Sequence, residues 1–315
     1  MSRSQAASRP FERLPFGALP AAPRRPHGYF ETEAHEVTMD STPFGRMRVH
    51  YRTAGEGPPL LLVHGLMTTS YSYRYVLREL GARYRLFIPD LPGCGRTDKP
   101  EGRSYRPQAI ATWIEEFLRA TGIYGCAAVG NSLGGYLCMR LALAEPEAFS
   151  RLVNIHSPGL PEPRIRALHV ALSIPGVRAA LAWWVRRDPH RWAHRNVHYH
   201  DETLKSLEEA REYGDPLGTP EGARAFVAYL AETVAPGPME DFVALLRERL
   251  AEGQPFPVPL LLMYSKSDPM VPPAIGGKLH ALVPDAEMVW LEGTSHFAHV
   301  DTPALVVPPI LEFLG

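Results

Sequence analysis

The sequence predicts an α/β protein with a mostly parallel, doubly wound sheet and an inserted helical cap. Three observations predict this class. Short apolar runs alternate with helical segments between residues 60 and 155, which is typical of a parallel sheet with right-handed crossovers. The alternation stops at Pro158, and only helical segments follow as far as Pro238. A strand-like run resumes after Pro259, so we expect a helical insertion within one sheet.

The composition is that of an ordinary globular protein. The chain has 315 residues, 45% apolar and 21% charged, which suits one large domain or one domain with an insertion. A formal net charge of −1 gives no reason to expect nucleic acid or anionic lipid as a partner. No apolar run reaches the length of a membrane span. We expect a core of residues 34–157 and 239–315 and a cap of residues 158–238.

The first 33 residues differ from the rest. They are rich in arginine and proline and lack the apolar segment of a secretory signal, so we expect a flexible or surface-draped arm. The three cysteines, Cys94, Cys126 and Cys138, have no paired spacing. Disulfides are therefore not expected, and a reducing, cytoplasmic location is predicted.

The elements before the cap follow from periodicity and turn residues. Alternating apolar residues predict two antiparallel strands between residues 37 and 51, joined by a turn over 40–45. The run Leu60–Val63 predicts a strand buried on both faces. Further strands are expected at 84–89, from 126 and at 151–155, and helices at 72–81, 107–121 and up to 144.

The second half begins with the cap. Its helices are expected at 165–174, 177–187, 188–199, 202–214 and 220–233. The core then continues with strands at 260–264 and 287–291 and helices at 274–282 and 302–314. Three tryptophans, Trp183, Trp184 and Trp192, lie in the cap, where they would shelter an apolar substrate or hold the cap together.

A Gly-x-Ser-x-Gly motif lies between the strand from residue 126 and the following helix. Gly130 and Gly134 leave room for a tight turn, so Ser132 can adopt a strained conformation with its hydroxyl above the sheet. The backbone N–H of Leu133, at the positive end of the helix, is then free to stabilise an oxyanion. The motif predicts a nucleophilic serine.

Two further residues complete a catalytic triad. Asp268 directly follows one apolar strand, and His296 lies in the loop after the next. A serine hydroxyl needs an imidazole to take its proton, and the imidazole needs a carboxylate to orient it. The chain order Ser132, Asp268, His296 therefore predicts nucleophile, acid and base at one edge of the sheet.

These residues and their flanking segments resemble the α/β-hydrolase superfamily over residues 34–315. The resemblance rests on the motifs His64-Gly65-Leu66, Asp90-Leu91-Pro92-Gly93-Cys94-Gly95, Gly130-Asn131-Ser132-Leu133-Gly134-Gly135, Ser267-Asp268-Pro269-Met270-Val271-Pro272 and His296-Phe297-Ala298-His299-Val300-Asp301-Thr302-Pro303. The chain looks like the capped branch, which includes haloalkane dehalogenases, epoxide hydrolases, carbon–carbon bond hydrolases and esterases. The resemblance implies that the N–H of Leu66 is the second oxyanion donor.

The resemblance also narrows the reaction. Branch members that attack alkyl halides or epoxides carry aspartate at the nucleophile position, whereas Ser132 favours acyl chemistry. We therefore expect a carboxylesterase-like serine hydrolase that acts on a small, largely apolar molecule through an acyl-enzyme. The alternatives are a carbon–carbon bond hydrolase, against which Met67-Thr68-Thr69 and Phe297 depart from the usual pattern, and a non-catalytic binding protein. Tentative pocket residues are Met67, Trp183, Trp184 and Phe297.

Other polar residues have simpler interpretations. His64 is expected to be structural, with its ring tied to nearby backbone, and Asp90 to belong to a structural loop. His299 is a rival base that geometry would decide. In the cap, the histidines at positions 190, 194 and 198 and the arginines at 186, 187, 191 and 195 are read as solvated surface rather than a metal site. No cofactor and no metal are expected, and nothing indicates an oligomeric state.

Overall fold

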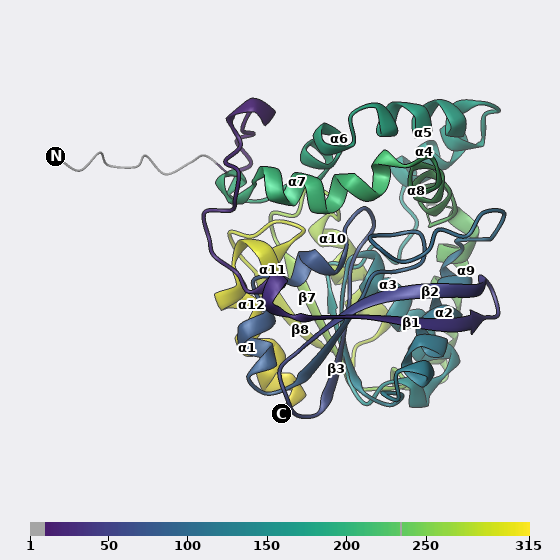
Figure 1. Cartoon of the computed structure of the whole chain (residues 1–315). Coiled ribbons are helices and arrows are strands. Elements are labelled where there is room, and N and C mark those ends of the chain that lie inside the picture. The colour runs from purple at the N-terminus through teal and green to yellow at the C-terminus, as the bar shows by residue number, and fades with distance from the viewer. Residues whose placement is uncertain (1–9, 234) are drawn as a thin grey trace.

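The computed structural model describes residues 10–233 and 235–315. An eight-stranded sheet with the order β1-β2-β4-β3-β5-β6-β7-β8 forms its centre (Figure 1). The strands are β1 (Glu33–Ser41), β2 (Gly45–Ala54), β3 (Pro59–Val63), β4 (Arg85–Pro89), β5 (Ala127–Asn131), β6 (Leu152–Ile155), β7 (Leu260–Ser265) and β8 (Glu287–Leu291). β2 is antiparallel to β1 and β4, and the other neighbours are parallel. The predicted α/β class with a mostly parallel sheet is confirmed.

Helices cover both faces of this sheet. Those of the predicted core are α1 (Leu77–Gly81), α2 (Pro107–Ala120), α3 (Leu133–Ala144), α10 (Pro273–Leu282), α11 (Ala298–Asp301) and α12 (Pro303–Leu314). Between β6 and β7 lie α4 (Pro163–Ser173), α5 (Val177–Arg187), α6 (Pro189–Asn196), α7 (Leu207–Gly214), α8 (Pro220–Thr233) and α9 (Pro236–Ala251). Short 3₁₀ helices occur at Phe16–Ala18, Tyr29–Glu31, Ser70–Tyr73, Pro146–Ala148, Glu202–Leu204 and Asp215–Gly218.

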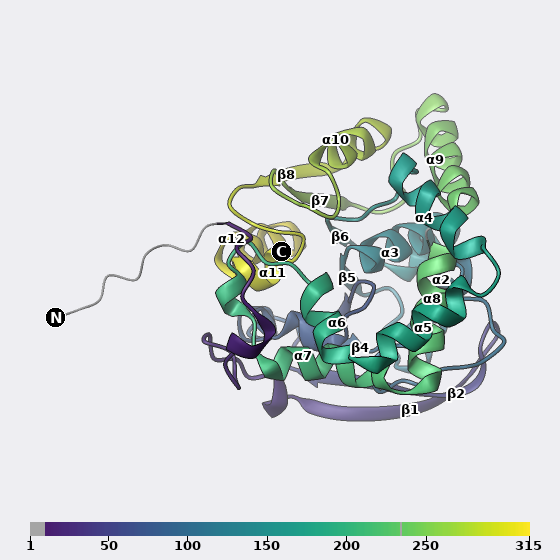
Figure 2. The ribbon, with the colours of Figure 1, turned by 90° about the horizontal axis from the view of Figure 1, so that it is seen from above.

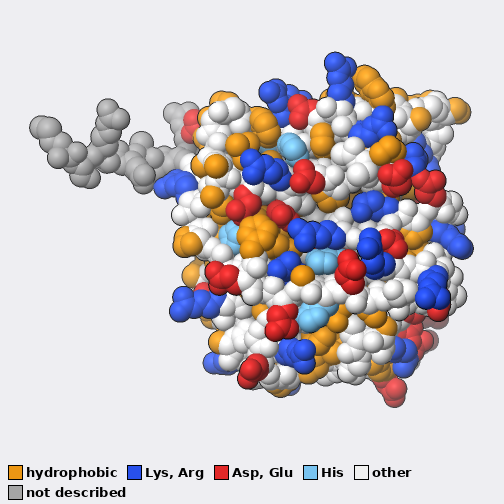
Figure 3. Space-filling view, viewed as in Figure 1, with side chains coloured by type: hydrophobic (Ala, Val, Ile, Leu, Met, Phe, Trp, Pro, Cys, Tyr) orange, Lys and Arg blue, Asp and Glu red, His pale blue; other side chains and the backbone are white. Residues whose placement is uncertain are grey.

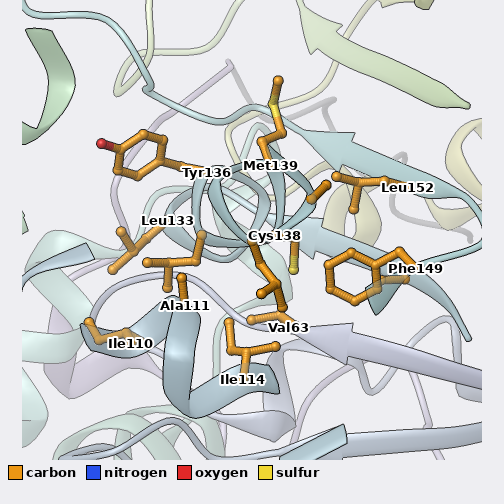
Figure 4. Packing of buried hydrophobic residues seen from close by; sticks show 14 of the residues in the cluster. Val63, Ile110, Ala111, Ile114, Leu133, Tyr136, Cys138, Met139, Phe149 and Leu152 are labelled. Atoms are coloured by element: carbon orange, nitrogen blue, oxygen red, sulfur yellow. The ribbon is translucent and has the colours of Figure 1, made fainter. Parts of the chain in front are cut away.

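The apolar run of β3 explains the two layers. Leu61 and Val63 belong to the hydrophobic core on the side of α2 and α3, and Leu60 and Leu62 to the core on the side of α1 and α12. Successive side chains of a strand point to opposite faces, so a run without alternation is buried on both. Figure 4 shows Val63, Ile114 and Cys138 meeting beneath α3. This packing fixes the position of the β5–α3 turn.

Two predicted helices are broken in the structure, and the helix α9 was not predicted. Residues 202–214 form the 3₁₀ helix Glu202–Leu204 followed by α7. Residues 72–81 form a 3₁₀ helix, Ser70–Tyr73, followed by a break and the short helix α1. The apolar residues of this segment, Tyr73, Val76, Leu77 and Leu80, are nevertheless buried. The break has a packing reason, because the Tyr73 hydroxyl donates to the Val63 carbonyl at 2.8 Å and Arg74 turns into a buried ion pair with Glu209 at 2.5 Å.

The segment between β6 and β7 lies over the carboxyl edge of the parallel strands. Seen from above, α5, α6 and α7 cross over β4 (Figure 2). The expected cap boundary at residue 238 falls within α9, so this helix spans both predicted regions. Residues 10–32 of the predicted arm lie along the surface, where the N–H of Leu207 donates to the Pro20 carbonyl at 2.8 Å. None of the described helices is by itself long and apolar enough to cross a membrane.

Candidate active site

Ser132 occupies the turn between β5 and α3 with φ 55° and ψ −122°. This left-handed conformation is rare for a residue with a side chain. A Cβ on Gly130 would lie 2.5 Å from the Gly135 nitrogen, and a Cβ on Gly134 would lie 2.1 Å from the Val63 oxygen. The two glycines of the motif therefore let the helix start directly against β3, as the sequence predicted. Ser132 remains partly exposed while Asn131 and Leu133 are buried.

Asp268 and His296 meet at the carboxyl ends of β7 and β8. The Nδ1 atom of His296 donates to Oδ2 of Asp268 at 2.7 Å. Oδ1 of Asp268 accepts from the N–H groups of Met270 at 2.7 Å and Val271 at 2.9 Å. Burial alone would raise the pKa of Asp268, but the His296 charge and these hydrogen bonds outweigh it and lower the pKa. Asp268 is therefore an ionised acceptor that orients the imidazole.

The loop of His296 is anchored beside Ser132. The side-chain amide of Asn131 donates to the His296 carbonyl at 3.2 Å and to the Ile155 carbonyl at 3.3 Å. The N–H of Ser132 also donates to Ile155, at 2.7 Å. The β5–α3 turn, which we call the elbow, is thus hydrogen-bonded both to the end of β6 and to the loop that carries His296.

His156 is a site residue that the sequence analysis missed. It follows β6 with φ 56° and is fully buried. Its Nε2 accepts from the Ser265 N–H at 2.6 Å, and its Nδ1 donates to the His296 carbonyl at 3.0 Å. Burial, together with the charge of His296, lowers the pKa of His156 to about 4, although Asp268 opposes the shift. The sequence feature that could have identified it is its position directly after β6, at the same edge of the sheet as Ser132 and Asp268.

The turn after β3 lies against the elbow. A Cβ on Gly65 would be 3.1 Å from the Ser132 Cβ, so Leu66 and Met67 follow at the serine. Met67 has φ 64°, and both residues line a cleft whose far wall includes Phe226 and Tyr229 from the cap. The N–H of Leu66 and the N–H of Leu133, the first residue of α3, are the candidate oxyanion donors.

His64 is structural, as predicted. Its Nε2 accepts from the Leu91 N–H at 3.0 Å, and its Nδ1 donates to the Gly65 carbonyl at 2.8 Å. Burial lowers its pKa, so the ring stays neutral. Asp90 is likewise a loop residue that accepts from the N–H groups of Ser70 at 2.8 Å and Arg96 at 2.9 Å.

His299, the rival base, is fully buried against the Tyr73 ring, with 5.0 Å between ring centroids. Neither of its ring nitrogens has a hydrogen-bond partner among the described residues. Burial lowers its pKa to about 3, helped by His156 and Arg74. Because His296 and not His299 bonds Asp268, the geometry favours His296 as the base.

The four tentative pocket residues lie in different places in the structure. Met67 lines the cleft between the turn after β3 and the cap, and Phe297 is buried with its ring edge-on to His296 at 5.3 Å. Trp183 and Trp184 are 56% and 54% exposed, and neither lines this cleft. Trp183 instead lines a separate cavity on the cap with Arg178 and Arg186, and the inward side of α5 holds Val185. A role of the two tryptophans in the substrate pocket stays a prediction.

The cap histidines do not converge. His190 pairs with Asp215 at 2.6 Å, and His194 contacts the Leu14 carbonyl at 2.9 Å. Within residues 10–233 and 235–315, one group of three side chains is close enough to share a metal ion, namely His156, Asp268 and His296. Both ring nitrogens of His156 are engaged by backbone groups, which favours a hydrogen-bonded cluster over a metal centre.

A family model described as the alpha/beta hydrolase fold matches residues 58–303, and the chain belongs to this family. An uncharacterized hydrolase, YugF of Bacillus subtilis, is 27% identical over 265 residues, covering 84% of this chain and 92% of that protein. Haloalkane dehalogenase 2 of Mycobacterium tuberculosis is 28% identical over 276 residues, covering 86% and 92%. A thermophilic esterase from Thermogutta terrifontis has the same fold, with a TM-score of 0.71, 21% identity and coverage of 89% and 98%. Membership in this family supports hydrolase activity.

Proposed function

We propose that this protein is a serine hydrolase that cleaves an ester-type bond of a small, largely apolar substrate through an acyl-enzyme. Ser132 attacks the carbonyl carbon, His296 takes the hydroxyl proton, and Asp268 stabilises the imidazolium. The N–H groups of Leu66 and Leu133 donate to the developing oxyanion. His296 then protonates the leaving group, and water attacks the acyl-enzyme by the reverse route.

The observation that carries the proposal is the strained Ser132 elbow beside a buried His296–Asp268 hydrogen bond of 2.7 Å. A left-handed serine costs on the order of 1–3 kcal/mol and persists only where the surroundings enforce it. Serine also distinguishes this site from relatives named for dehalogenation, since the sequence resemblance associates that chemistry with aspartate. The carbon–carbon bond hydrolase and the binding protein stay as alternatives for the assay to separate.

The cap is part of this proposal. Residues 158–238 cover the carboxyl edge of the sheet, and Phe226 and Tyr229 line a cleft together with Met67 and with Leu66, the candidate oxyanion donor. An aromatic wall with few polar groups suits an apolar acyl or alcohol portion. We therefore assign the cap to substrate selection and residues 34–157 and 239–315 to the chemistry.

The decisive experiment compares the wild type with Ser132→Ala on short p-nitrophenyl esters, together with labelling by a fluorophosphonate. We expect kcat to fall on the order of 10⁶-fold, as for other triad nucleophiles, and labelling to disappear. Ser150→Ala, at an exposed serine before β6, serves as the matched control and should keep both.

Each alternative has its own outcome. Equal activity of Ser132→Ala and the wild type would refute the proposed mechanism. Turnover of vinylogous diketones but not of esters would favour the carbon–carbon bond hydrolase. Stoichiometric retention of a ligand without product would indicate a binding protein.

A further inference from the structure

The outward side of α4 is apolar. Ile165 and Leu172 point into the protein, as expected for the buried stripe of a surface helix. On the opposite side, Ala167 and Ala171 are exposed together with Val170 at 64% and Ile174 at 55%. A helix that faces water normally carries polar residues there. α4 therefore presents apolar side chains on both sides.

The outward side of the next helix, α5, carries exposed aromatic rings. Leu181 and Val185 pack inward, while Trp183 and Trp184 are more than half exposed. The guanidinium of Arg187, one turn after Trp183, lies 5.4 Å from the indole centroid. We call the exposed residues Val170, Ile174, Trp183, Trp184, Arg186 and Arg187 the cap face.

The surroundings of the cap face are strongly basic. Residues 163–196 contain seven arginines and one acidic residue, Asp188, a formal charge of +6 against −1 for the whole chain. Within the described part of the chain, Arg178, Arg186 and Arg187 form no ion pair. Basic and apolar side chains adjoin along the upper edge of the molecule in Figure 3, over α5 and α6. The net charge of the whole chain conceals this segregation.

We propose that the cap face docks on the surface of an anionic lipid bilayer. Exposed aliphatic side chains, exposed tryptophans and unpaired arginines on the outward sides of two consecutive helices are the combination that amphipathic helices use to lie in the headgroup region. The basic charge complements anionic lipid. A second copy bound through the same face would instead place one basic surface against another.

The geometry favours lying on the bilayer over crossing it. α4 and α5 are each eleven residues long and are bent by 98° at the break between them. Since a span needs about 20 residues in one helix, neither reaches across. The cap lies over the carboxyl edge of the sheet, so docking would hold the edge at which Ser132 lies near the bilayer.

The test is flotation of the full-length protein with vesicles of phosphatidylcholine, with and without phosphatidylglycerol. The Ser132→Ala protein is measured in parallel, so that binding is scored independently of hydrolysis. We expect binding to the anionic vesicles, weakened by added salt, and a blue shift of tryptophan emission that Trp183→Phe/Trp184→Phe removes. Arg186→Glu/Arg187→Glu and Val170→Glu/Ile174→Glu should each lower the partition coefficient by roughly tenfold or more.

Matched controls lie outside the cap face. Arg247→Glu removes an exposed arginine on α9, and Leu305→Glu changes an exposed leucine on α12. Both should leave the partition coefficient within about twofold, since neither residue faces the bilayer. Circular dichroism of every variant excludes misfolding. The proposal is overturned if anionic vesicles bind no protein, if the controls lose binding equally, or if the cap-face variants instead abolish a dimer seen without vesicles.

Discussion

At the scale of single residues, the site depends on glycines that have no Cβ atom. Gly134 starts α3 so close to β3 that any side chain would overlap the Val63 carbonyl, and the same carbonyl accepts from Tyr73 at 2.8 Å. The backbone there has little freedom to yield. Ser132 keeps its left-handed conformation because its neighbours on both sides are held in this way.

This packing predicts opposite effects for two glycine substitutions. Gly134→Ala should lower the free energy of unfolding by roughly 3 kcal/mol or more and reduce esterase activity, because a Cβ would lie 2.1 Å from the Val63 oxygen. Gly277→Ala, on α10, has open space around its Cβ and should raise the free energy of unfolding by about 0.5–1 kcal/mol. Urea denaturation measures both, and a neutral Gly134→Ala would contradict this account.

At the scale of elements, a buried ion pair joins the cap to the core. Arg74 follows the 3₁₀ helix Ser70–Tyr73, and its guanidinium contacts Glu209 of α7 at 2.5 Å with side chains 0% and 4% exposed. The Tyr199 hydroxyl donates to the same carboxylate at 2.6 Å, and Tyr71 and Tyr75 lie within 4.5 Å of the guanidinium. Burial raises the pKa of Glu209, and Arg74 opposes this shift. The pair therefore fixes where the cap sits on the core.

Breaking this pair is expected to be costly, and replacing it less so. Arg74→Met leaves Glu209 buried without its partner and should destabilise the protein by about 3–5 kcal/mol. Arg74→Met/Glu209→Leu should recover most of that loss, because neither partner of the pair then leaves an unpaired buried charge. Lys266→Ala, which removes an exposed pair with Glu292 at 2.7 Å, should change stability by less than about 1 kcal/mol. The three free energies come from chemical denaturation, and a double variant as unstable as Arg74→Met would refute the interpretation.

At the scale of the whole molecule, Asp301 connects three distant segments. Its carboxylate accepts from the Ser295 N–H, next to His296, at 2.6 Å and from the His200 N–H of the cap at 3.0 Å. Its backbone carbonyl accepts from Arg25 of the predicted arm at 3.1 Å. The histidine loop, the cap and the arm thus meet at one buried acid.

Asp301 predicts a distinctive pH dependence of stability. Burial raises its pKa from 3.8 to about 7, although the N–H groups of Ser295 and His200 oppose the shift. Between these values the folded protein holds a proton that the unfolded chain has released, so the Asp301 contribution to the free energy of unfolding falls as pH rises and levels off above about 7.

The measurement is the difference in unfolding free energy between the wild type and Asp301→Asn across this range. The difference should decline with rising pH, while contributions from the buried histidines, which have the opposite sign, cancel between the two proteins. Asp241→Asn, at an exposed position on α9, is the matched control. A flat curve for Asp301→Asn would disprove the assignment.

Much of the fold was predictable because short stretches of sequence are enough to indicate its strands and turns. The run Leu60–Val63 is apolar at every position, and only a strand with both faces buried needs that. The Gly-x-Ser-x-Gly motif predicts the elbow because a side chain at either glycine would overlap the backbone close to Ser132. The break between Ser70–Tyr73 and α1 was not predictable, because it depends on Glu209 in the cap.

The sequence by itself determined the strands and most of the helices, the strained serine, and the order in which Ser132, Asp268 and His296 follow their strands. Only the tertiary structure brought His156 to the His296 carbonyl, tied Asp301 to the cap, and turned Trp183 outward. Periodicity reports which side of an element is apolar, but not which distant segment covers that side or leaves it bare. Contacts between segments arise from packing of the whole chain, so they appear only once the elements are placed against one another.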